Sequence, residues 1–307
     1  MSGYIERITG DTGERLLREL SGRLWKELTG KKPETGLAEF MRGYSDFGES
    51  ELFRSVRSSN PAGEEDGAAG RLLAASFLAR IFILSRSAAL EDAVNNTLSE
   101  TFSSGGKKLS LKSIQAELVR QPKRGERELA LRAGKPAQQK LNTLLRKKLD
   151  AMTESAQALG FGDYGELVEK TSGLVSENTA EAAKAFLADT EYASKDILTW
   201  FLARRLELKR SQAEEHDLAF LLNSGELRGN FPKRDMLSFS RPLLEASGLT
   251  PEGGITYDSE RRTDKISDGF AIPLDPPVKT GLSIYPVGSV RDYEHFFGSL
   301  GRALSFM

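Results

Sequence analysis

The chain of 307 residues contains no cysteine and only two histidines, His216 and His295. The absence of cysteine excludes disulfide bonds, thiolate metal ligands and thiol nucleophiles. A zinc site of the H-E-x-x-H type needs two histidines one helical turn apart, and these two do not have that spacing. The sequence therefore predicts no zinc site of this type and no cofactor.

Neither sign of charge is in excess, since 43 Lys and Arg face 44 Asp and Glu. A net charge of -1 argues against a general attraction to nucleic acid. No apolar run approaches the roughly 20 residues of a membrane span, because the longest, near Leu72 to Leu84, contains Ser76 and Arg80. The N-terminal residues lack a basic head followed by an apolar stretch. We therefore expect a cytoplasmic protein with neither a nucleic-acid nor a membrane partner.

Apolar residues at intervals of three and four predict helices through most of the first 222 residues. The stretch 13–29 shows the pattern in Leu16, Leu20, Leu24 and Leu28. Segment 103–137 is more polar, and we expect one helix between two loops there. Further helices are predicted at 36–57 (interrupted near Gly43), 68–100, 126–159, 163–172, 177–189 and 191–222.

The pattern changes after residue 223. Turn residues separate short β-like runs at Ile255–Tyr257, Phe270–Ile272 and Leu282–Tyr285. A last helix is expected from Asp292, as its N-cap, to about Phe306. The fold class is therefore mainly α, an elongated multi-helix domain with a small antiparallel β-sheet near the C-terminus. We expect residues 1–222 to form the helical domain, with 223–307 packed against it as one unit.

Residues 266–306 contain, in order, a strand pair, a glycine turn at Gly288, the pair Asp292-Tyr293 and a helix that includes Leu300-Gly301. This segment resembles the helical zinc oligopeptidases (gluzincins) of the thimet oligopeptidase and oligopeptidase F type. Upstream, His216-Asp217-Leu218 and Asn230-Phe231-Pro232-Lys233 follow the order of the soluble bacterial members. The resemblance covers about residues 180–306. It implies the fold of the N-terminal part of such an enzyme.

The motif that carries the chemistry of that family is degenerate here. The family's metal-binding helix reads H-E-x-G-H, and the resemblance places Gly298 on its first histidine, Ser299 on its glutamate and Arg302 on its second histidine. In the family the histidines hold zinc, and the glutamate takes a proton from the metal-bound water. Gly298 offers no ligand, the Ser299 hydroxyl is too weakly basic, and Arg302 places a fixed cation where the metal would lie. The third zinc ligand of the family lies beyond Met307. We therefore expect a truncated relative without peptidase activity.

The leading hypothesis is a module that binds a protein or a peptide. In the resembling enzymes an extended peptide lies along an edge strand, a mode that needs only backbone donors and acceptors. Phe270, Ile272, Leu282 and Tyr285 are the candidate contacts, unless that edge is covered or solvated. The last helix has apolar residues with no later chain to cover them, so Phe297 and Leu304 are candidate contacts for a partner or for a homodimer.

Two other hypotheses stay open. In the first hypothesis, the chain is the substrate-binding half of a split metallopeptidase that another chain completes. In the second, it is a decaying gene fragment. His295 is interpreted as a histidine on the helix surface beside the cap, the alternative being a relocated metal ligand with Glu294 or Asp292. His216 lies among acidic residues and is interpreted as ending or turning a helix, the alternative being weak metal binding.

Overall fold

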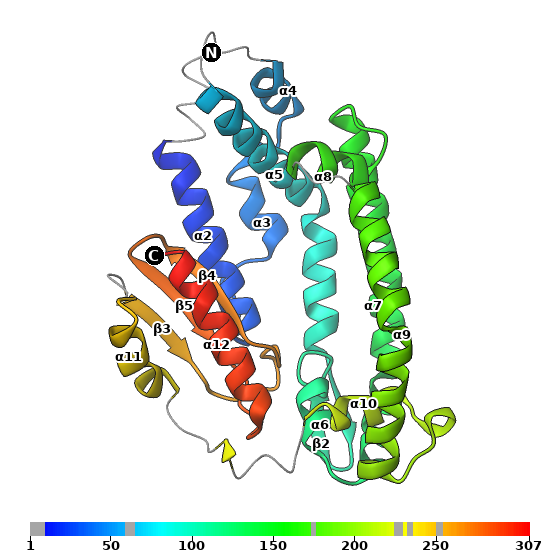
Figure 1. Cartoon of the computed structure of the whole chain (residues 1–307). Helices are drawn as coiled ribbons and strands as arrows, with labels where there is room; N and C mark the ends of the chain where they lie inside the picture. Colours follow the sequence, from blue (N-terminus) through cyan, green and yellow to red (C-terminus); the bar gives the residue numbers. More distant parts are fainter. Residues whose placement is uncertain (1–9, 59–64, 173–175, 224–229, 232–235, 250–253) are drawn as a thin grey trace. The chain divides into compact units, whose positions relative to one another are not determined.

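The structure is a computed structural model that describes residues 10–58, 65–172, 176–223, 230–231, 236–249 and 254–307. Of the sequence motif Asn230-Phe231-Pro232-Lys233, the last two residues lie outside this part. The described residues are mainly helical, which confirms the predicted fold class. The helices are α2 (Asp11–Leu28), α3 (Leu37–Arg42), α4 (Ser50–Ser58), α5 (Glu65–Ser99), α6 (Ile114–Arg120), α7 (Arg124–Ala158), α8 (Tyr164–Ser172), α9 (Ser176–Leu206), α10 (Glu215–Leu221), α11 (Met236–Ala246) and α12 (Val290–Ser305), with short 3-10 helices η1 (Ser45–Gly48) and η2 (Arg210–Gln212) (Figure 1).

The chain forms two compact units that interleave along the sequence. The first contains Met1–Leu17, Glu34–Asn96 and Lys140–Lys195, and the second contains Arg18–Pro33, Thr97–Gln139 and Asp196–Met307. The change from a helical to a strand pattern in the sequence predicts a division at residue 222. That division stays a prediction.

Apolar contacts between α4, α5 and α8 build the first unit. Phe53 of α4 is 1% exposed, and its ring centroid lies 6.0 Å from that of Phe161, which precedes α8. Leu78 of α5 and Leu167 of α8 are also buried. The Asp92 carboxylate accepts from the Leu37 N–H at 2.7 Å and thereby satisfies a donor at the start of α3. One unit thus joins helices that are far apart in sequence.

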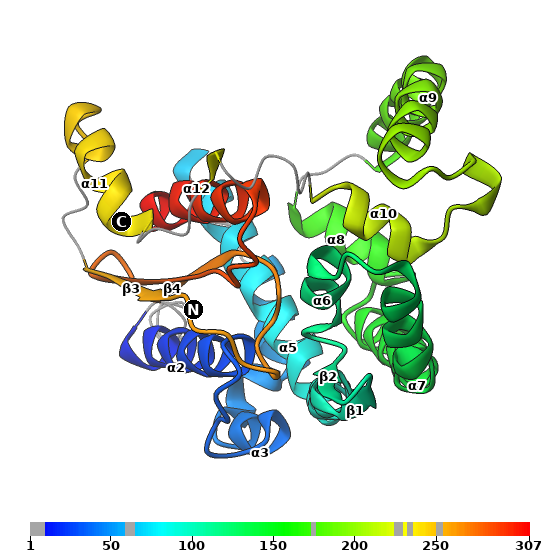
Figure 2. The ribbon, with the colours of Figure 1, turned by 90° about the horizontal axis from the view of Figure 1, so that it is seen from below.

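The second unit contains a three-stranded sheet in the order β3 (Gly254–Asp258), β5 (Lys279–Ser283), β4 (Phe270–Asp275). Helix α12 covers one face of the sheet, and residues 18–28 of α2 lie on the other (Figure 2). A side chain at Gly281 of β5 would meet the Trp25 ring at 2.6 Å, so glycine lets α2 approach this closely. The core on the α12 side consists of Met236, Leu244, Leu282, Ile284, Phe296, Leu300 and Ala303.

The sheet differs from the prediction in one pairing. Strands β4 and β5 are antiparallel as expected, but β3 pairs with β5 in parallel. The connection over residues 259–269 is long enough to leave a gap beside β3, with β4 on its far side. The next strand, β5, then fills this gap and runs parallel to β3. The buried Lys265 ammonium anchors this connection by donating to the Asp258 carbonyl and carboxylate, both at 2.9 Å.

The polar segment after α5 also differs from the prediction. Instead of a loop it forms a β-hairpin, β1 (Thr101–Ser104) and β2 (Lys107–Ser110). Gly105 and Gly106 both have positive φ, 56° and 80°, which the two-residue turn of such a hairpin requires. The expected helix follows as α6.

Helix α5 corrects the expectation that no apolar run approaches the length of a membrane span. Its part Gly70–Ser99 is, among the described residues, long and apolar enough to cross a membrane by length and composition. Regular helix continues through Ser76 and Arg80, which the sequence reading took as interruptions. Of its most apolar window, 44% is buried within the protein.

Candidate functional site

Helix α12 begins at a cap that the sequence analysis placed three residues too late. Ser289 is the N-cap, and its hydroxyl accepts from the Arg291 N–H at 3.2 Å. Asp292 lies in the first turn, where its carboxylate accepts from the N–H groups of Val287 and Gly288 at 2.7 and 2.6 Å. The two residues form a capping box. Gly288 has a φ of 83°, which explains the glycine turn before the helix.

The three positions that the resemblance assigned to the motif, Gly298, Ser299 and Arg302, lie on the third and fourth turns of α12. Gly298 and Arg302 are exposed, and nothing lies within 4 Å of a side chain built at Gly298. Ser299 is only 2% exposed. None of the three side chains offers a ligand that zinc accepts, so the residues present do not fit the metal of the resembling enzymes.

The start of β4 packs directly on this part of α12. A side chain at Gly269 would lie 2.6 Å from the His295 Cβ and 2.9 Å from the Ser299 hydroxyl oxygen. The helix and the strand therefore touch at a glycine, and the space around Ser299 is filled. A glutamate side chain in place of Ser299 would have to displace the start of β4.

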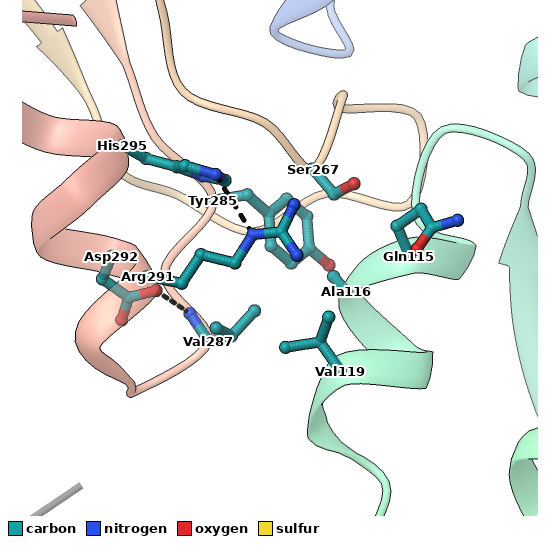
Figure 3. Close-up of a pocket in the computed structure, with 9 residues that line it drawn as sticks. All are labelled: Gln115, Ala116, Val119, Ser267, Tyr285, Val287, Arg291, Asp292 and His295. Atoms are coloured by element: carbon teal, nitrogen blue, oxygen red, sulfur yellow. Dashed lines mark hydrogen bonds between the residues drawn. The ribbon is translucent and has the colours of Figure 1, made fainter. Parts of the chain in front are cut away.

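His295 lines a small recess between α12, α6 and the connection to β4 (Figure 3). Arg291 Nε donates to His295 Nε2 at 3.2 Å, and Arg291 Nη2 lies 3.7 Å from the Asp268 carboxylate. Burial lowers the pKa of His295, and the neighbouring Arg291 cation lowers it further. The ring is therefore neutral at pH 7, with Nε2 as the acceptor.

The hydrogen bond from Arg291 occupies the lone pair that a metal would need. The recess itself has a volume of about 10 Å³, room for about one water molecule. Within the described part of the chain, no three histidine, aspartate or glutamate side chains gather as ligands of a metal ion would. These observations favour a structural role of His295 over a relocated ligand.

The four candidate contacts of the predicted peptide-binding edge do not all lie on an edge strand. Phe270 and Ile272 belong to β4, which is an edge strand of the described sheet. Leu282 lies in the central strand β5 and is 0% exposed, so it is not on an edge. Tyr285 follows β5 and lines the recess beside His295, where burial raises its pKa. The sequence alone did not reveal which strand is central.

The apolar face of α12 was expected to need a cover from earlier helices or from a second chain, and earlier segments of this chain cover most of it. Phe296, Leu300 and Ala303 are between 0% and 3% exposed, because β4, β5 and α11 pack on them. Leu304 is half-buried against the same core. Phe297 is 37% exposed and remains accessible.

A buried ion cluster on α10 escaped the sequence analysis. Asp217 is 0% exposed and forms ion pairs of 3.0 Å with Arg124 and with the buried Arg127 of α7. Burial alone would raise the pKa of Asp217, but hydrogen bonds from Arg124, the Glu214 N–H and Arg127 outweigh it, so the pKa lies below its usual range. Arg124 and Arg127 lie three residues apart in the sequence, a spacing that gives no indication of a partner about 90 residues away.

His216 belongs to the same cluster. It is the second residue of α10 and is 1% exposed, so it lies near a helix end but inside the protein. Its Nε2 lies 3.4 Å from Asp217, and its Nδ1 lies 3.6 Å from Glu214, both without hydrogen-bond geometry. Arg127 donates to the His216 carbonyl at 3.1 Å and stacks on Phe220 at 4.4 Å. The arrangement ties α10 to α7.

The sequence matches no profile of a protein family and no curated protein. Among solved structures, the fold is similar to that of a provisionally named oligoendopeptidase F from Bacillus anthracis str. Ames, with a TM-score of 0.63 and 13% sequence identity. The similarity covers 96% of this chain and 58% of that protein, so the chain spans little more than half of its length. At this identity the likeness shows the fold alone. The chain therefore has an oligopeptidase-like fold.

Proposed function

We propose that this chain is a catalytically inactive relative of the zinc oligopeptidases and binds a protein or a peptide. The observation that carries the proposal is the packing of α12. The helix that resembles the family's metal-binding helix has Gly298 and Arg302 at the ligand positions, and Ser299 is buried under Gly269. The degenerate motif is thus accompanied by a tertiary contact that leaves no room for the family's glutamate.

A peptide-binding role is supported by the edge strand β4. An extended peptide that pairs with an edge needs backbone N–H and C=O groups and no catalytic residue. Phe270 is half-buried at the start of β4, with its ring 5.8 Å from Trp25. The Ile272 side chain is buried, so it would contribute its backbone. In this proposal β4 replaces Leu282 and Tyr285 as the contact region.

The first experiment measures turnover and binding on the same sample. A quenched fluorescent peptide library with added zinc is expected to show no hydrolysis that a chelator abolishes. The library peptides that bind the chain are then synthesised with a photoreactive group, and they are expected to crosslink to residues 270–275. Chelator-sensitive hydrolysis contradicts the inactive assignment, and crosslinks confined to other segments contradict the β4 edge.

A split metallopeptidase is the second candidate, and the coverage of the structural neighbour favours it. The similarity covers 58% of that protein, and in this candidate a second polypeptide supplies the metal site. Fractionated cell extract that confers zinc-dependent hydrolysis on the purified chain would support this candidate. Phe297, as the accessible apolar residue of α12, is our proposed contact for such a partner or for a homodimer. We further propose a cytoplasmic location.

A further inference from the structure

Helix α9 (Ser176–Leu206) presents a stripe of large apolar and small side chains to solvent (Figure 1). Phe186, Ile197 and Trp200 are 66%, 57% and 60% exposed. They lie within about 60° of one another around the helix axis, because an α-helix turns by about 100° per residue. The same stripe contains four small residues, Thr179, Ala182, Thr190 and Ala193.

The spacing of this stripe is the same in both directions along the helix. Its positions 179, 182, 186, 193, 197 and 200 are separated by three, four, seven, four and three residues. Two antiparallel copies of α9 can therefore align their stripes face to face, with a two-fold axis between residues 189 and 190. In this register each large side chain lies opposite a small one of the second copy: Phe186 opposite Ala193, Ile197 opposite Ala182 and Trp200 opposite Thr179. A two-fold interface requires a surface that is complementary to itself in this way.

The area of the stripe is sufficient for a weak, specific pair. Large side chains of this kind have about 150–250 Å² of surface, so the exposed parts of Phe186, Ile197 and Trp200 come to about 350 Å² in each copy. With the exposed small residues, two copies together bury roughly 1,000 Å², near the lower limit for a specific interface. Such interfaces have dissociation constants of about 1–100 µM. Below that range the chain is a monomer with this face open, so unfolding measured there does not include the pair.

We propose that two copies of this chain pair through α9, antiparallel and with two-fold symmetry. A second copy is the occupant because the stripe complements itself in both spacing and side-chain size. Asp189 limits the affinity, since it is exposed at the edge of the stripe beside the two-fold axis and meets the Asp189 carboxylate of the second copy. The proposal concerns α9 alone and does not depend on the peptide binding proposed above.

The first test is sedimentation velocity of the whole chain from about 0.5 to 200 µM. We expect a monomer at the lowest concentration and a dimer at the highest. Phe186→Ala and Trp200→Ala are each expected to weaken the dimer by at least about tenfold, because they remove the large side chains at its centre and its ends. Circular dichroism checks that each variant keeps its helix content.

Two matched controls separate this pair from general stickiness. Tyr192 is 78% exposed but lies about 120° from Phe186 around the helix, so Tyr192→Ala is expected to leave the dissociation constant unchanged. Asp189→Asn is expected to tighten the dimer by about threefold, because it removes the repulsion across the axis. Glu181→Gln removes the same charge from an exposed position on the opposite side of α9 and is expected to have no effect.

Cysteine crosslinking tests the register without removing a large side chain. The chain contains no cysteine, so a single introduced thiol reports on one position. Thr190→Cys places the thiols of two copies beside the two-fold axis, and we expect a disulfide between them under mild oxidation. The thiols of Ala182→Cys are about 22 Å apart along the helix in this register, and we expect no disulfide.

A chain that stays monomeric over the whole concentration range overturns the proposal. It is equally overturned if the dimer survives Phe186→Ala and Trp200→Ala but is lost in Phe297→Ala, or if Tyr192→Ala weakens it as much as Phe186→Ala. Crosslinking of Ala182→Cys as fast as Thr190→Cys indicates a parallel pair and overturns the antiparallel register.

Discussion

Helices α12 and α9 both contain several large apolar residues, which are mostly covered in α12 and mostly exposed in α9. In α12, Phe296 and Leu300 are 0% and 3% exposed against the sheet. In α9, Phe186 and Trp200 are 66% and 60% exposed, and so are other large apolar residues, Leu187, Tyr192 and Ile197, at 57% or more. The difference shows that apolar residues within a helix do not by themselves decide its burial, and that contacts with distant segments do.

The largest expected effect compares matched truncations on the two helices. Phe296→Ala is expected to lower the free energy of unfolding by about 3–5 kcal/mol, because it leaves a cavity in the core. Phe186→Ala is expected to change it by less than about 0.5 kcal/mol. Urea unfolding in a Trp200→Phe background, followed by the fluorescence of the buried Trp25, measures both. A similar loss in the two variants would mean that the α9 face is covered in solution.

The second prediction concerns α10, which follows α9 and is anchored to α7 by ion pairs. Asp217→Asn is expected to cost about 3 kcal/mol at pH 7, because it leaves the buried Arg127 without its carboxylate. Asp196→Asn on the exposed part of α9 is the matched control and is expected to change little.

The pH dependence of this effect has a defined sign. The folded-state pKa of Asp217 is lowered, so its stabilisation is fully present above the ordinary aspartate pKa of about 3.9. It is lost as the pH falls through the folded value. The difference between wild type and Asp217→Asn should therefore shrink below about pH 4 in urea titrations. A difference that stays constant from pH 7 to pH 3 would contradict this assignment.

The third prediction compares two glycines at the covered and the open sides of α12. Gly269→Ala is expected to destabilise by about 1–3 kcal/mol, since the new Cβ would collide with the His295 backbone oxygen at 2.7 Å. Gly298→Ala is expected to stabilise by about 0.5–1 kcal/mol, because the site is open and alanine favours a helix. Thermal unfolding shows the opposite signs directly. Equal signs would mean that α12 does not pack on β4 in this way.

The smallest expected effects concern the ends and surfaces of the same two helices. Ser289→Ala removes the cap of α12 and is expected to cost about 1 kcal/mol. Lys195→Gln breaks the exposed pair with Glu191 on α9 and is expected to cost at most about 0.5 kcal/mol. Thermal melts of both variants test this order, and a reversed order would count against the cap.

Particular elements show how far the sequence reading could go. The stripe at 13–29 predicted α2 correctly, and the apolar run at 68–100 predicted α5. The hairpin at 101–110 was missed because its strands have four residues each and are polar. The cap was misplaced although Ser289 and Asp292 have capping-box spacing, because two candidate caps stood close together.

In the candidate site, too, some features could be predicted from the sequence and others could not. The motif positions Gly298, Ser299 and Arg302 could be read directly, because they occupy one helix. The hydrogen bond between Arg291 and His295 was open to prediction as a pair four residues apart, yet the burial of the ring was not. The central position of Leu282 depended on a parallel pairing that no local pattern encodes.

The sequence by itself determined the chemistry that this chain can offer. With no cysteine and two distant histidines, it excludes thiol chemistry and the H-E-x-x-H zinc site in any conformation. It also determined most helices, because their periodicity is local. Only the tertiary structure decided that β5 is central, that Gly269 fills the space over Ser299 and that the apolar face of α12 is covered. These features join residues far apart in the chain, and no local pattern of side chains specifies such contacts.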